Sequence, residues 1–494
     1  MTQPAVYTDS LNSVVKRDSG FIKLYLIFPF ALQTILIMSL SNFMNPTIGL
    51  FMNVICTIAV VATYVFILER TMLMFIHLFV LIVTQNLTIG IGMTFTNIEI
   101  GSDSLKFLLI NKEIFAIVFL LCMLIRYINK IRLYKYELTI PLVFGVSFLS
   151  FIISDASFDA KAYYLRTLFI IFVAYAIGRI LFFSFYNKKI ELNRVLSFVS
   201  YTGLLVAIIG FGMMMLPKYT YIWQDWFNLG VITETKTGKY SPYPNWSTPL
   251  GSLIFPRMFS IIFDPICLGY ILATSLLCYI IKGNRMPFVT PILATALLFT
   301  LVKGAIAIVI ISLLWTLFLR NKKIPPLPIV LTFIAATIAV FYILPYTGFK
   351  SSHDVHFNGF IEPILNLPQN LIGEGLGNGG NYYSMKVGIP AWELSYMGTE
   401  SVIGVLVYQL GLPGLIPYVS FFMLLTSNLM KHSYVLKCKE RILYTLLSGI
   451  VLSIFLAGML QESALGINYT GILMAIIGFY VSKMSQNKQY NHTP

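Results

Sequence analysis

The segment "FIKLYLIFPFALQTILIMSL", residues 21–40, decides the fold class. It is almost entirely apolar and long enough for one helix to cross the roughly 30 Å hydrocarbon core of a bilayer. The first twenty residues are polar, and no cleavable signal peptide is evident. We therefore expect this segment to stay in the protein as its first membrane helix.

The composition extends this expectation to the whole chain. Of its 494 residues, 57% are hydrophobic and 11% are charged, and the mean hydropathy is +0.80. A water-soluble core cannot bury that much apolar surface. We expect an all-α polytopic membrane protein with a single integral membrane domain over residues 1–494 and no internal repeat.

Apolar runs of about 17 to 25 residues, bounded by charges, predict about fourteen transmembrane helices. The predicted spans are 21–41, 47–68, 71–95, 113–132, 138–154, 166–186, 196–216, 258–281, 286–302, 304–319, 328–345, 399–429, 442–460 and 468–484. Lys303 and Gly304 make the only break between 286 and 319.

The basic residues predict the orientation. With the N-terminus in the cytoplasm, roughly two-thirds of all lysines and arginines fall in cytoplasmic loops, as the positive-inside rule requires. Both termini are then cytoplasmic. The net charge of +14 is mainly this topology signal, and the basic residues form no continuous stripe that would bind nucleic acid. None of the five cysteines is placed to form an external disulfide or a zinc pair.

Two long connections, 217–257 and 346–398, are external in this topology, and loops of this length in a compact bundle are usually functional. The first is rich in aromatic residues, among them Trp223 and Trp246. Two interpretations stand side by side: an aromatic belt at the membrane interface, or flat rings that contact the apolar faces of sugars.

The second loop predicts a short amphipathic helix on the outer surface, with apolar residues between Val355 and Leu365. His353 and His356 stand near its start. A histidine pair three residues apart can bind metal, but no convincing third ligand accompanies it, so we expect no metal and favour a capping or hydrogen-bonding role. "GEGLGNGG" follows no strand, so we interpret it as a glycine turn close to a ligand and not as a dinucleotide site.

Four charged residues are predicted to meet at the outer ends of four helices. Arg257 ends the first long loop, Lys303 lies in a tight external turn, Arg166 begins one span and Glu400 begins another. Each cation has a structural alternative as an interfacial anchor that reaches the headgroups, and for Arg166 alone we favour the anchor. Their convergence favours a functional site.

Arg257 is followed by "MFSIIFDPICLG", which is predicted to carry Asp264 about two turns into a span. Pro265 would kink that helix beside a cavity, or Asp264 would be the structural partner of a buried cation. Arg179, inside another span, is expected to be a paired or snorkelling residue. His77 and Glu462 stay ambiguous.

The chemistry of an external site follows from what the chain lacks. It has no Walker loop, no His-Glu-x-x-His and no Gly-x-Ser-x-Gly. Nucleotides are absent outside the cell, so an activated donor would have to arrive on a membrane lipid. A lipid pyrophosphate is a suitable leaving group because arginine and lysine stabilise its developing charge. Glu400 or a histidine could take the acceptor's proton.

Several motifs resemble the superfamily of O-antigen and capsular polysaccharide polymerases and O-antigen ligases, over residues 250 to 420. "RMFSIIFDPICLG" is similar to its Arg, Phe, Asp/Asn-Pro, Gly pattern. "LIGEGLGNGG" followed by "ESVIGVLVYQLGLPGL" is similar to its Gly-x-Gly turn and its helix ending in Gly-x-x-Gly. "FTLVKGAIAIVI" resembles its Ser-Arg-Gly/Ala segment, with Lys303 where arginine is usual.

The resemblance implies a GT-C-type membrane glycosyltransferase that needs no metal or cofactor. The donor would be an oligosaccharide on undecaprenyl pyrophosphate, with Arg257 and Lys303 as pyrophosphate contacts. Lysine in place of arginine keeps the charge but loses the bidentate fork. Ligases of the family typically carry a His-containing pair where this chain has Glu400 and Ser401, which favours a polymerase.

The sequence therefore predicts a repeat-unit polymerase of the bacterial plasma (inner) membrane, acting on its external face. Arg257, Lys303 and Arg166 would hold the diphosphate, and Glu400 or His356 would assist the acceptor. Asp264, His353, Trp223 and Trp246 are further candidate substrate contacts. Its partners would be membrane lipids, a chain-length regulator and a flippase of the same pathway. The alternatives are an O-antigen ligase and a lipid-linked oligosaccharide flippase, although a transporter would place its charges at mid-membrane.

Overall fold

The computed structural model describes residues 46–490, except for 97–104, 106–107, 186, 216–226, 228, 238–245, 251–252, 284–285 and most of 321–349. The predicted span 21–41 and Trp223 lie outside the described residues, as does nearly all of the predicted span 328–345. His353 lies in a described helix, but its side chain is outside the described part.

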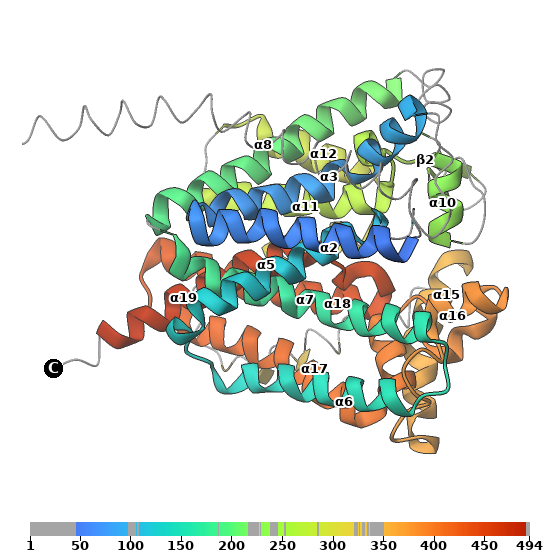
Figure 1. Ribbon diagram of the computed structural model, residues 1–494. Helices are drawn as coiled ribbons and strands as arrows, with labels where there is room; N and C mark the ends of the chain where they lie inside the picture. The colour runs from blue at the N-terminus through green and yellow to red at the C-terminus, as the bar shows by residue number, and fades with distance from the viewer. Residues whose placement is uncertain are drawn as a thin grey trace, which may run out of the picture.

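The chain folds into a bundle of helices (Figure 1). The longest are α3 (Thr71–Thr96), α6 (Thr139–Ile153), α7 (Phe158–Ser184), α8 (Lys188–Met215), α11 (Pro265–Lys282), α17 (Val402–Ser433), α18 (Cys438–Leu460) and α19 (Ile472–Tyr490). Among the described residues, these eight, with short helical extensions on α6, α17 and α19, are long and apolar enough to cross a membrane.

Shorter helices fill the bundle and account for other predicted spans. They are α2 (Pro46–Ala62) with its continuation η1 (Thr63–Ile67), α5 (Asn111–Tyr127), α12 (Val289–Phe299) and α13 (Lys303–Leu319). The prediction of a helical membrane protein is confirmed. The number fourteen stays a prediction, because these helices are short and two predicted spans lie outside the described residues.

Three predicted span starts are wrong by about two turns. The helix predicted to begin at residue 258 begins at Pro265, and residues 258–264 form a turn that contains the short helix η4 (Ser260–Ile262). The helices predicted to begin at residues 166 and 196 begin earlier, at Phe158 and Lys188. Hydropathy marks only the apolar stretch, whereas α7 and α8 start in the polar residues before it and α11 starts at its capping residue, Asp264.

Large apolar side chains cover the outside of the bundle. Ile153 is 80% exposed and Ile125 is 75% exposed, and many other isoleucine, leucine and phenylalanine side chains point outward. A protein surrounded by water rarely leaves so much apolar surface uncovered. The described exterior is therefore the surface of a membrane-embedded protein.

The helices approach closely where small residues face each other. A Cβ atom on Gly178 of α7 would lie 1.7 Å from the Ala475 carbonyl oxygen of α19. A Cβ atom on Gly478 of α19 would lie 2.2 Å from the Tyr175 carbonyl oxygen of α7. Polar pairs join α13 and α18: the Trp315 indole donates to Ser448 Oγ at 2.9 Å, and Ser312 and Ser453 lie 3.0 Å apart. Both devices are typical of membrane helix packing.

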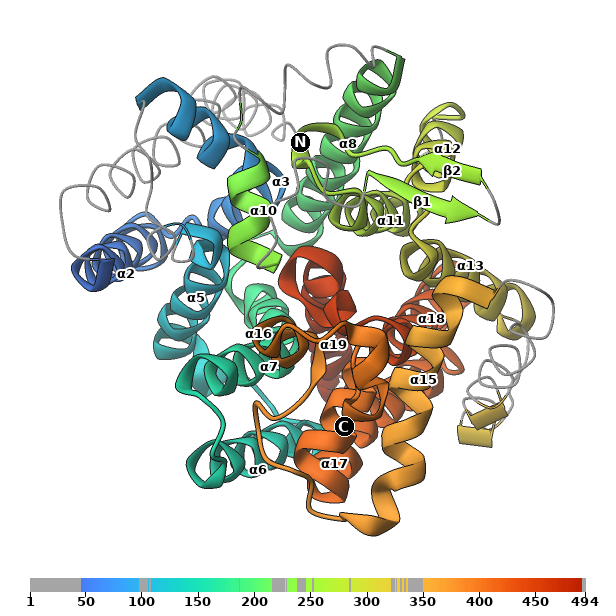
Figure 2. The ribbon, with the colours of Figure 1, turned by 90° about the vertical axis from the view of Figure 1, so that its right-hand side faces the viewer.

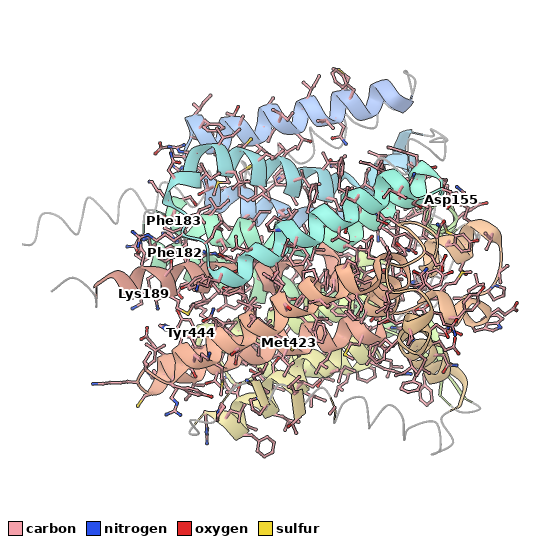
Figure 3. The ribbon with its side chains drawn as sticks, turned by 90° about the horizontal axis from the view of Figure 1, so that it is seen from below. Asp155, Phe182, Phe183, Lys189, Met423 and Tyr444 are labelled. Carbon is pink, nitrogen blue, oxygen red and sulfur yellow. The ribbon has the colours of Figure 1, made fainter. Side chains whose placement is uncertain are left out.

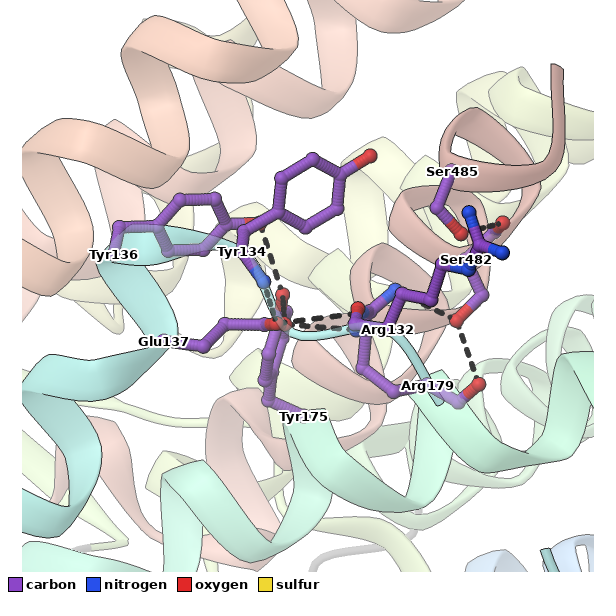
Figure 4. Close-up of polar contacts among 8 residues, drawn as sticks. All are labelled: Arg132, Tyr134, Tyr136, Glu137, Tyr175, Arg179, Ser482 and Ser485. Atoms are coloured by element: carbon purple, nitrogen blue, oxygen red, sulfur yellow. Dashed lines mark hydrogen bonds and ion pairs between the residues drawn. The ribbon is translucent and has the colours of Figure 1, made fainter. Parts of the chain in front are cut away.

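A buried ion pair joins α7 to the short helix η3 (Lys135–Leu138) (Figure 4). Arg179 Nε lies 2.8 Å from Glu137 Oε1, and each side chain is only 3% exposed. Arg179 also donates to Ser482 Oγ on α19 at 2.9 Å, and Tyr175 donates to the same carboxylate at 2.6 Å. Arg179 is therefore paired, which is one of the two roles that the sequence left open.

The two ends of the bundle differ. One end carries α10 (Leu229–Thr237), the hairpin of β1 (Ser247–Leu250) and β2 (Leu253–Pro256), α15 (Lys350–Asn366) and α16 (Gly380–Val387) (Figure 2). Figure 3 places Asp155 toward this end and Lys189 and Tyr444 toward the other. We call the first the loop end of the molecule and the second the basic end.

Candidate functional site

Three helices begin at the loop end, and each follows a non-glycine residue with a positive φ. These residues are Phe263 (φ 56°) before α11, Leu301 (φ 54°) before α13 and Glu400 (φ 66°) before α17. Left-handed backbone is unfavourable for such side chains and persists only where surrounding contacts enforce it, which is common at functional sites. These turns place Asp264, Lys303 and Glu400.

Arg257 is held by the β hairpin on one side and by the end of α12 on the other. Its backbone N–H donates to the Trp246 oxygen at 2.7 Å, and its Nε donates to the Thr300 oxygen at 2.8 Å. Within the described part of the chain its two Nη groups have no hydrogen-bond partner. Burial lowers the pKa of Arg257, and the nearby Asp264 carboxylate opposes this. The guanidinium is thus fixed at one edge, with donors left for a ligand.

Asp264 does not lie two turns inside a helix, so that prediction is wrong. It is the N-cap of α11: its Oδ1 accepts a hydrogen bond from the Ile266 N–H at 2.9 Å, and Pro265 occupies the first helical position. Proline is well tolerated there, so it starts the helix and does not kink it. Asp264 acts as a cap and as the carboxylate nearest to Arg257.

Lys303 is the first residue of α13, directly after the turn that Thr300 begins. The predicted break between the two spans is therefore confirmed. Lys303 is exposed, and its charge and that of Arg257 repel each other. A cation at a helix N-terminus is unfavourable, and the first turn of α13 has no acidic residue. An anion bound between Lys303 and Arg257 would relieve both effects.

Glu400 and His356 form a pair at the start of α17. His356 Nδ1 lies 3.6 Å from Glu400 Oε2, and the two side chains are 34% and 32% exposed. Close backbone packing brings them together, because a Cβ atom on Gly359 of α15 would lie 1.8 Å from the Thr399 oxygen. Ser401 caps α17 by accepting from the Gly404 N–H at 3.0 Å. A helix is present where the sequence predicts one in this loop, as α15.

Arg166 lies in the third turn of α7, half-buried, with its guanidinium carbon 5.1 Å from the centre of the Tyr163 ring. That ring stacks on Tyr382 of α16 at 4.6 Å. No ion-pair partner of Arg166 lies among the described residues. The side chain is therefore a cation supported by aromatic rings and is not saturated by a carboxylate.

Glu462, which the sequence left ambiguous, lies beside this group. It begins the short helix η8 (Glu462–Leu465) between α18 and α19 and is 4% exposed. Its Oε2 accepts a hydrogen bond from the Asn381 N–H at 2.8 Å. Burial raises the pKa of Glu462 to about 8, the Asn381 bond opposes this, and the Glu400 carboxylate raises the pKa further. The only sequence signal was an acid at the end of an apolar span.

The η8 segment connects the arginine and glutamate sides of the loop end. Gln461, next to Glu462, accepts a hydrogen bond from the Tyr270 hydroxyl of α11 at 2.8 Å. A Cβ atom on Gly304, next to Lys303, would lie 3.1 Å from the same Gln461 oxygen. Helices α7 and α17 also pack against η8. Electrostatic interactions link Arg257 with Lys303, and they link Glu400 with both His356 and Glu462. These five residues and Arg166 lie at the loop end, and we call the six together the loop-end cluster.

Trp246 is not an accessible ring for a sugar, so its assignment as a substrate contact is wrong. It is 8% exposed and stacks on Phe259 with ring centres 3.7 Å apart. Its indole nitrogen donates to the Phe263 oxygen at 3.2 Å. Trp246 thus stabilises the turn that carries Arg257. Trp223 and the His353 side chain lie outside the described residues, and the described part of the chain contains no group of three metal-ligating side chains.

The glycine segment forms the predicted turn, with φ values of 90°, 95° and 97° at Gly373, Gly375 and Gly377. It packs against α17: the Gly375 N–H donates to the Gln409 oxygen at 3.0 Å. A Cβ atom at Gly373 would lie 2.6 Å from the Gln409 carbonyl, so the close approach is to protein backbone. This turn holds the first half of α17, at whose start Glu400 lies.

Comparison of the chain with protein-family models gave no match, and comparison with curated proteins gave none either.

The chemistry open to the loop-end cluster follows from its charges. Arg257, Lys303 and Arg166 are cations with capacity for an anionic ligand, and arginine binds phosphate oxygens in bidentate fashion. Glu400 and His356 can accept a proton from a hydroxyl group held beside them. The arrangement therefore suits a ligand with an anionic part and a reaction that removes a proton from an alcohol.

Proposed function

We propose that the protein is a polysaccharide repeat-unit polymerase. It transfers the growing glycan from undecaprenyl pyrophosphate to a sugar hydroxyl of a new lipid-linked unit. The observation that carries the proposal is that Arg257, Lys303, Arg166 and the Glu400–His356 pair all lie at the loop end of a membrane-embedded bundle. The motif resemblance over residues 250 to 420 supports the same activity and, with it, a GT-C-type architecture.

The cations act on the donor. The bond between the anomeric carbon and the pyrophosphate oxygen breaks, and its electron pair leaves with the diphosphate, which stays on the lipid. Arg257 and Lys303 bind this diphosphate and stabilise the charge that develops on it. Arg166 contacts the second phosphate or the first sugar. No metal or cofactor takes part in this scheme.

The Glu400–His356 pair acts on the acceptor. The acceptor hydroxyl oxygen forms the new bond to the anomeric carbon, and its proton passes to the Glu400 carboxylate. The 3.6 Å separation lets His356 share this proton or hold the carboxylate in place. The products are one new glycosidic bond, undecaprenyl pyrophosphate and a proton.

The loop end faces the exterior of the cell in this proposal. Figure 3 places Lys189 at the opposite end, and Lys189 belongs to one of the basic clusters that the positive-inside rule assigns to the cytoplasm. The protein then resides in the bacterial plasma membrane with both termini inside. Lipid-linked substrates reach the site from the outer leaflet, so a flippase must supply them, and a chain-length regulator would act alongside.

The test is chain growth in vitro. Purified protein in detergent is incubated with lipid-linked repeat units isolated from cells whose copy of this gene is deleted, and the products are separated on a gel. Wild type should form a ladder of increasing length. Arg257→Ala should reduce it by about 10²- to 10³-fold, the usual effect of removing one donor from a charge-stabilising site. Arg194→Ala, which removes an exposed arginine near the start of α8, is the matched control and should leave the ladder unchanged.

A ladder of equal intensity from Arg257→Ala would contradict the proposed site. If wild type forms no ladder but transfers finished glycan to another lipid or protein acceptor, the protein is the ligase. If it only moves the lipid-linked unit across a vesicle membrane, it is the flippase, and the proposed chemistry is wrong.

A further inference from the structure

Glu462 is the buried member of the loop-end cluster, and it contacts Glu400 only through another residue. The Asn381 N–H donates to Glu462 Oε2 at 2.8 Å, while the Asn381 side-chain oxygen accepts from the Glu400 N–H at 3.1 Å. Asn381 thus binds one carboxyl residue by its backbone and the other by its side chain.

The backbone at Glu400 needs this support. Its φ of 66° is unfavourable for a glutamate, and the residue stands at the point where the chain enters α17. The bond from the Glu400 N–H to Asn381 fixes the backbone there. This backbone sets the orientation of the Glu400 carboxylate, whose Oε2 lies 3.6 Å from His356 Nδ1.

We propose that Glu462 is a positioning residue for the Glu400–His356 pair, which it holds through Asn381. This inference rests on the polymerase function proposed above. Glu462 itself is too buried to contact an acceptor, because it is only 4% exposed. Its role is to keep the proton acceptor aligned with the hydroxyl that it serves.

The charge state of Glu462 makes this role detectable in the pH dependence of the reaction. The titratable groups that interact with it are Tyr163 and Tyr164 of α7 and Glu400 from the turn before α17, and Tyr164 is also hydrogen-bonded to its carboxyl group. Helix α18 has its titratable residues only within 438–444, at the basic end. Burial raises the pKa of Glu462 to about 8, so the side chain is neutral at pH 7. Above pH 8 a second negative charge develops beside Glu400 and the anionic donor.

The variants that test the proposal are Glu462→Gln, Glu462→Ala and Asn381→Ala, with Glu393→Gln as control because Glu393 is an exposed carboxylate of the same loop. A glutamine keeps the oxygen that accepts from Asn381 and stays neutral at all pH values. Elongation rates are measured from pH 6 to pH 9, together with the melting temperature of each variant.

We expect Glu462→Ala and Asn381→Ala each to reduce the rate by about 10- to 100-fold, as misalignment of a reacting group does. The double variant should be no slower than the slower single variant, because both act in one chain of contacts. Glu462→Gln should keep a rate within about threefold of wild type at pH 7 and lose the decline that wild type shows above pH 8. Glu393→Gln should follow wild type throughout.

A wild-type rate for Glu462→Ala would overturn the proposal, as would a Glu462→Gln profile that declines above pH 8 in parallel with wild type. Absence of a ladder from wild type would instead overturn the polymerase function itself.

A second experiment does not depend on enzymatic activity. It measures how fast diethyl pyrocarbonate modifies His356, and the modified peptide is detected by mass spectrometry. Glu462→Ala should change this rate in the same direction as Glu400→Gln, and Glu462→Gln should not; equal rates in all variants would contradict the positioning role.

Discussion

Two arginines on one helix show the difference between the ends of the molecule. Arg166 and Arg179 are separated by about 20 Å along α7, at 1.5 Å per residue. Arg179 has Glu137, Ser482 and the Arg132 carbonyl oxygen around its guanidinium. Among the described residues, Arg166 has only the face of Tyr163. A charge inside a membrane protein is tolerated when it is fully paired, so the saturated arginine is structural and the unsaturated one has capacity for a ligand.

The carboxyl groups show the same difference. Glu137 receives the Arg179 guanidinium and the Tyr175 hydroxyl at 2.6 Å. Glu462 is equally buried but receives the N–H of Asn381 and faces a second carboxylate, Glu400. The buried Glu137–Arg179 pair at the basic end thus neutralises its own charges. The loop end keeps like charges close together, which stabilises the fold less and favours function.

The largest effect is expected from Arg179→Ala, at the basic end. Removing one partner of a buried ion pair leaves the other charge unpaired and costs about 3–5 kcal/mol. We expect a marked fall in the melting temperature of the purified protein, whereas Arg320→Ala, an exposed arginine at the end of α13, should leave it unchanged.

Exchange of both partners sharpens this prediction. The double variant Glu137→Met/Arg179→Met replaces the pair by apolar side chains of similar length and should regain most of the stability. If the double variant is as unstable as Arg179→Ala, the pair has a role beyond charge compensation and the contrast with the loop end fails.

We expect the free energy of unfolding to depend on pH through the buried carboxyl group of Glu462. Folding raises the pKa of Glu462 from 4.5 to about 8, so the folded state holds a proton that the unfolded state releases. Its stabilising contribution is therefore complete below pH 4.5 and is lost as the pH rises toward 8. The free energy of unfolding should fall by up to about 1.4 kcal/mol per pH unit in this window.

This slope is checked by thermal unfolding of wild type and Glu462→Gln at pH 5, 6, 7 and 8. The melting temperature of Glu462→Gln should depend less on pH than that of wild type. Parallel curves would mean that Glu462 is ionised in the folded protein, and its neutral state would have to be abandoned.

The smallest effect is expected from Lys303→Arg. The guanidinium restores the bidentate fork while keeping the charge, so the affinity for a diphosphate lipid should rise by about two- to threefold. Lys303→Ala should lower it by about tenfold, the usual contribution of a hydrogen bond to a charged group. An unchanged affinity in Lys303→Ala would restrict the anion site to Arg257 and Arg166.

Hydropathy predicted much of the fold because each membrane helix is a local feature of the sequence. Each of the eight long helices overlaps a predicted span, and the break at Lys303 is visible in the sequence as the only polar interruption in a long apolar run. The pairing of Arg179 could also be anticipated, since an arginine in the middle of a span requires partners.

Contacts between distant segments could not be predicted in this way. Hydropathy does not distinguish a ring buried in protein from one at the membrane surface, so Trp246 was misassigned. It also misses the starts of α7, α8 and α11 by about two turns, which misplaces Asp264. Glu462 stays ambiguous in the sequence because its neighbour Asn381 lies 81 residues away.

The most direct test of the account is the dissociation constant of undecaprenyl pyrophosphate for the protein in lipid nanodiscs, measured by native mass spectrometry. It is compared for wild type, Arg257→Ala and the control Arg194→Ala. The account predicts that Arg257→Ala raises the dissociation constant about 10- to 100-fold, with an unchanged melting temperature, while Arg194→Ala binds as wild type does. Equal binding by Arg257→Ala and wild type would show that the loop end does not hold the diphosphate, and the central claim would be wrong.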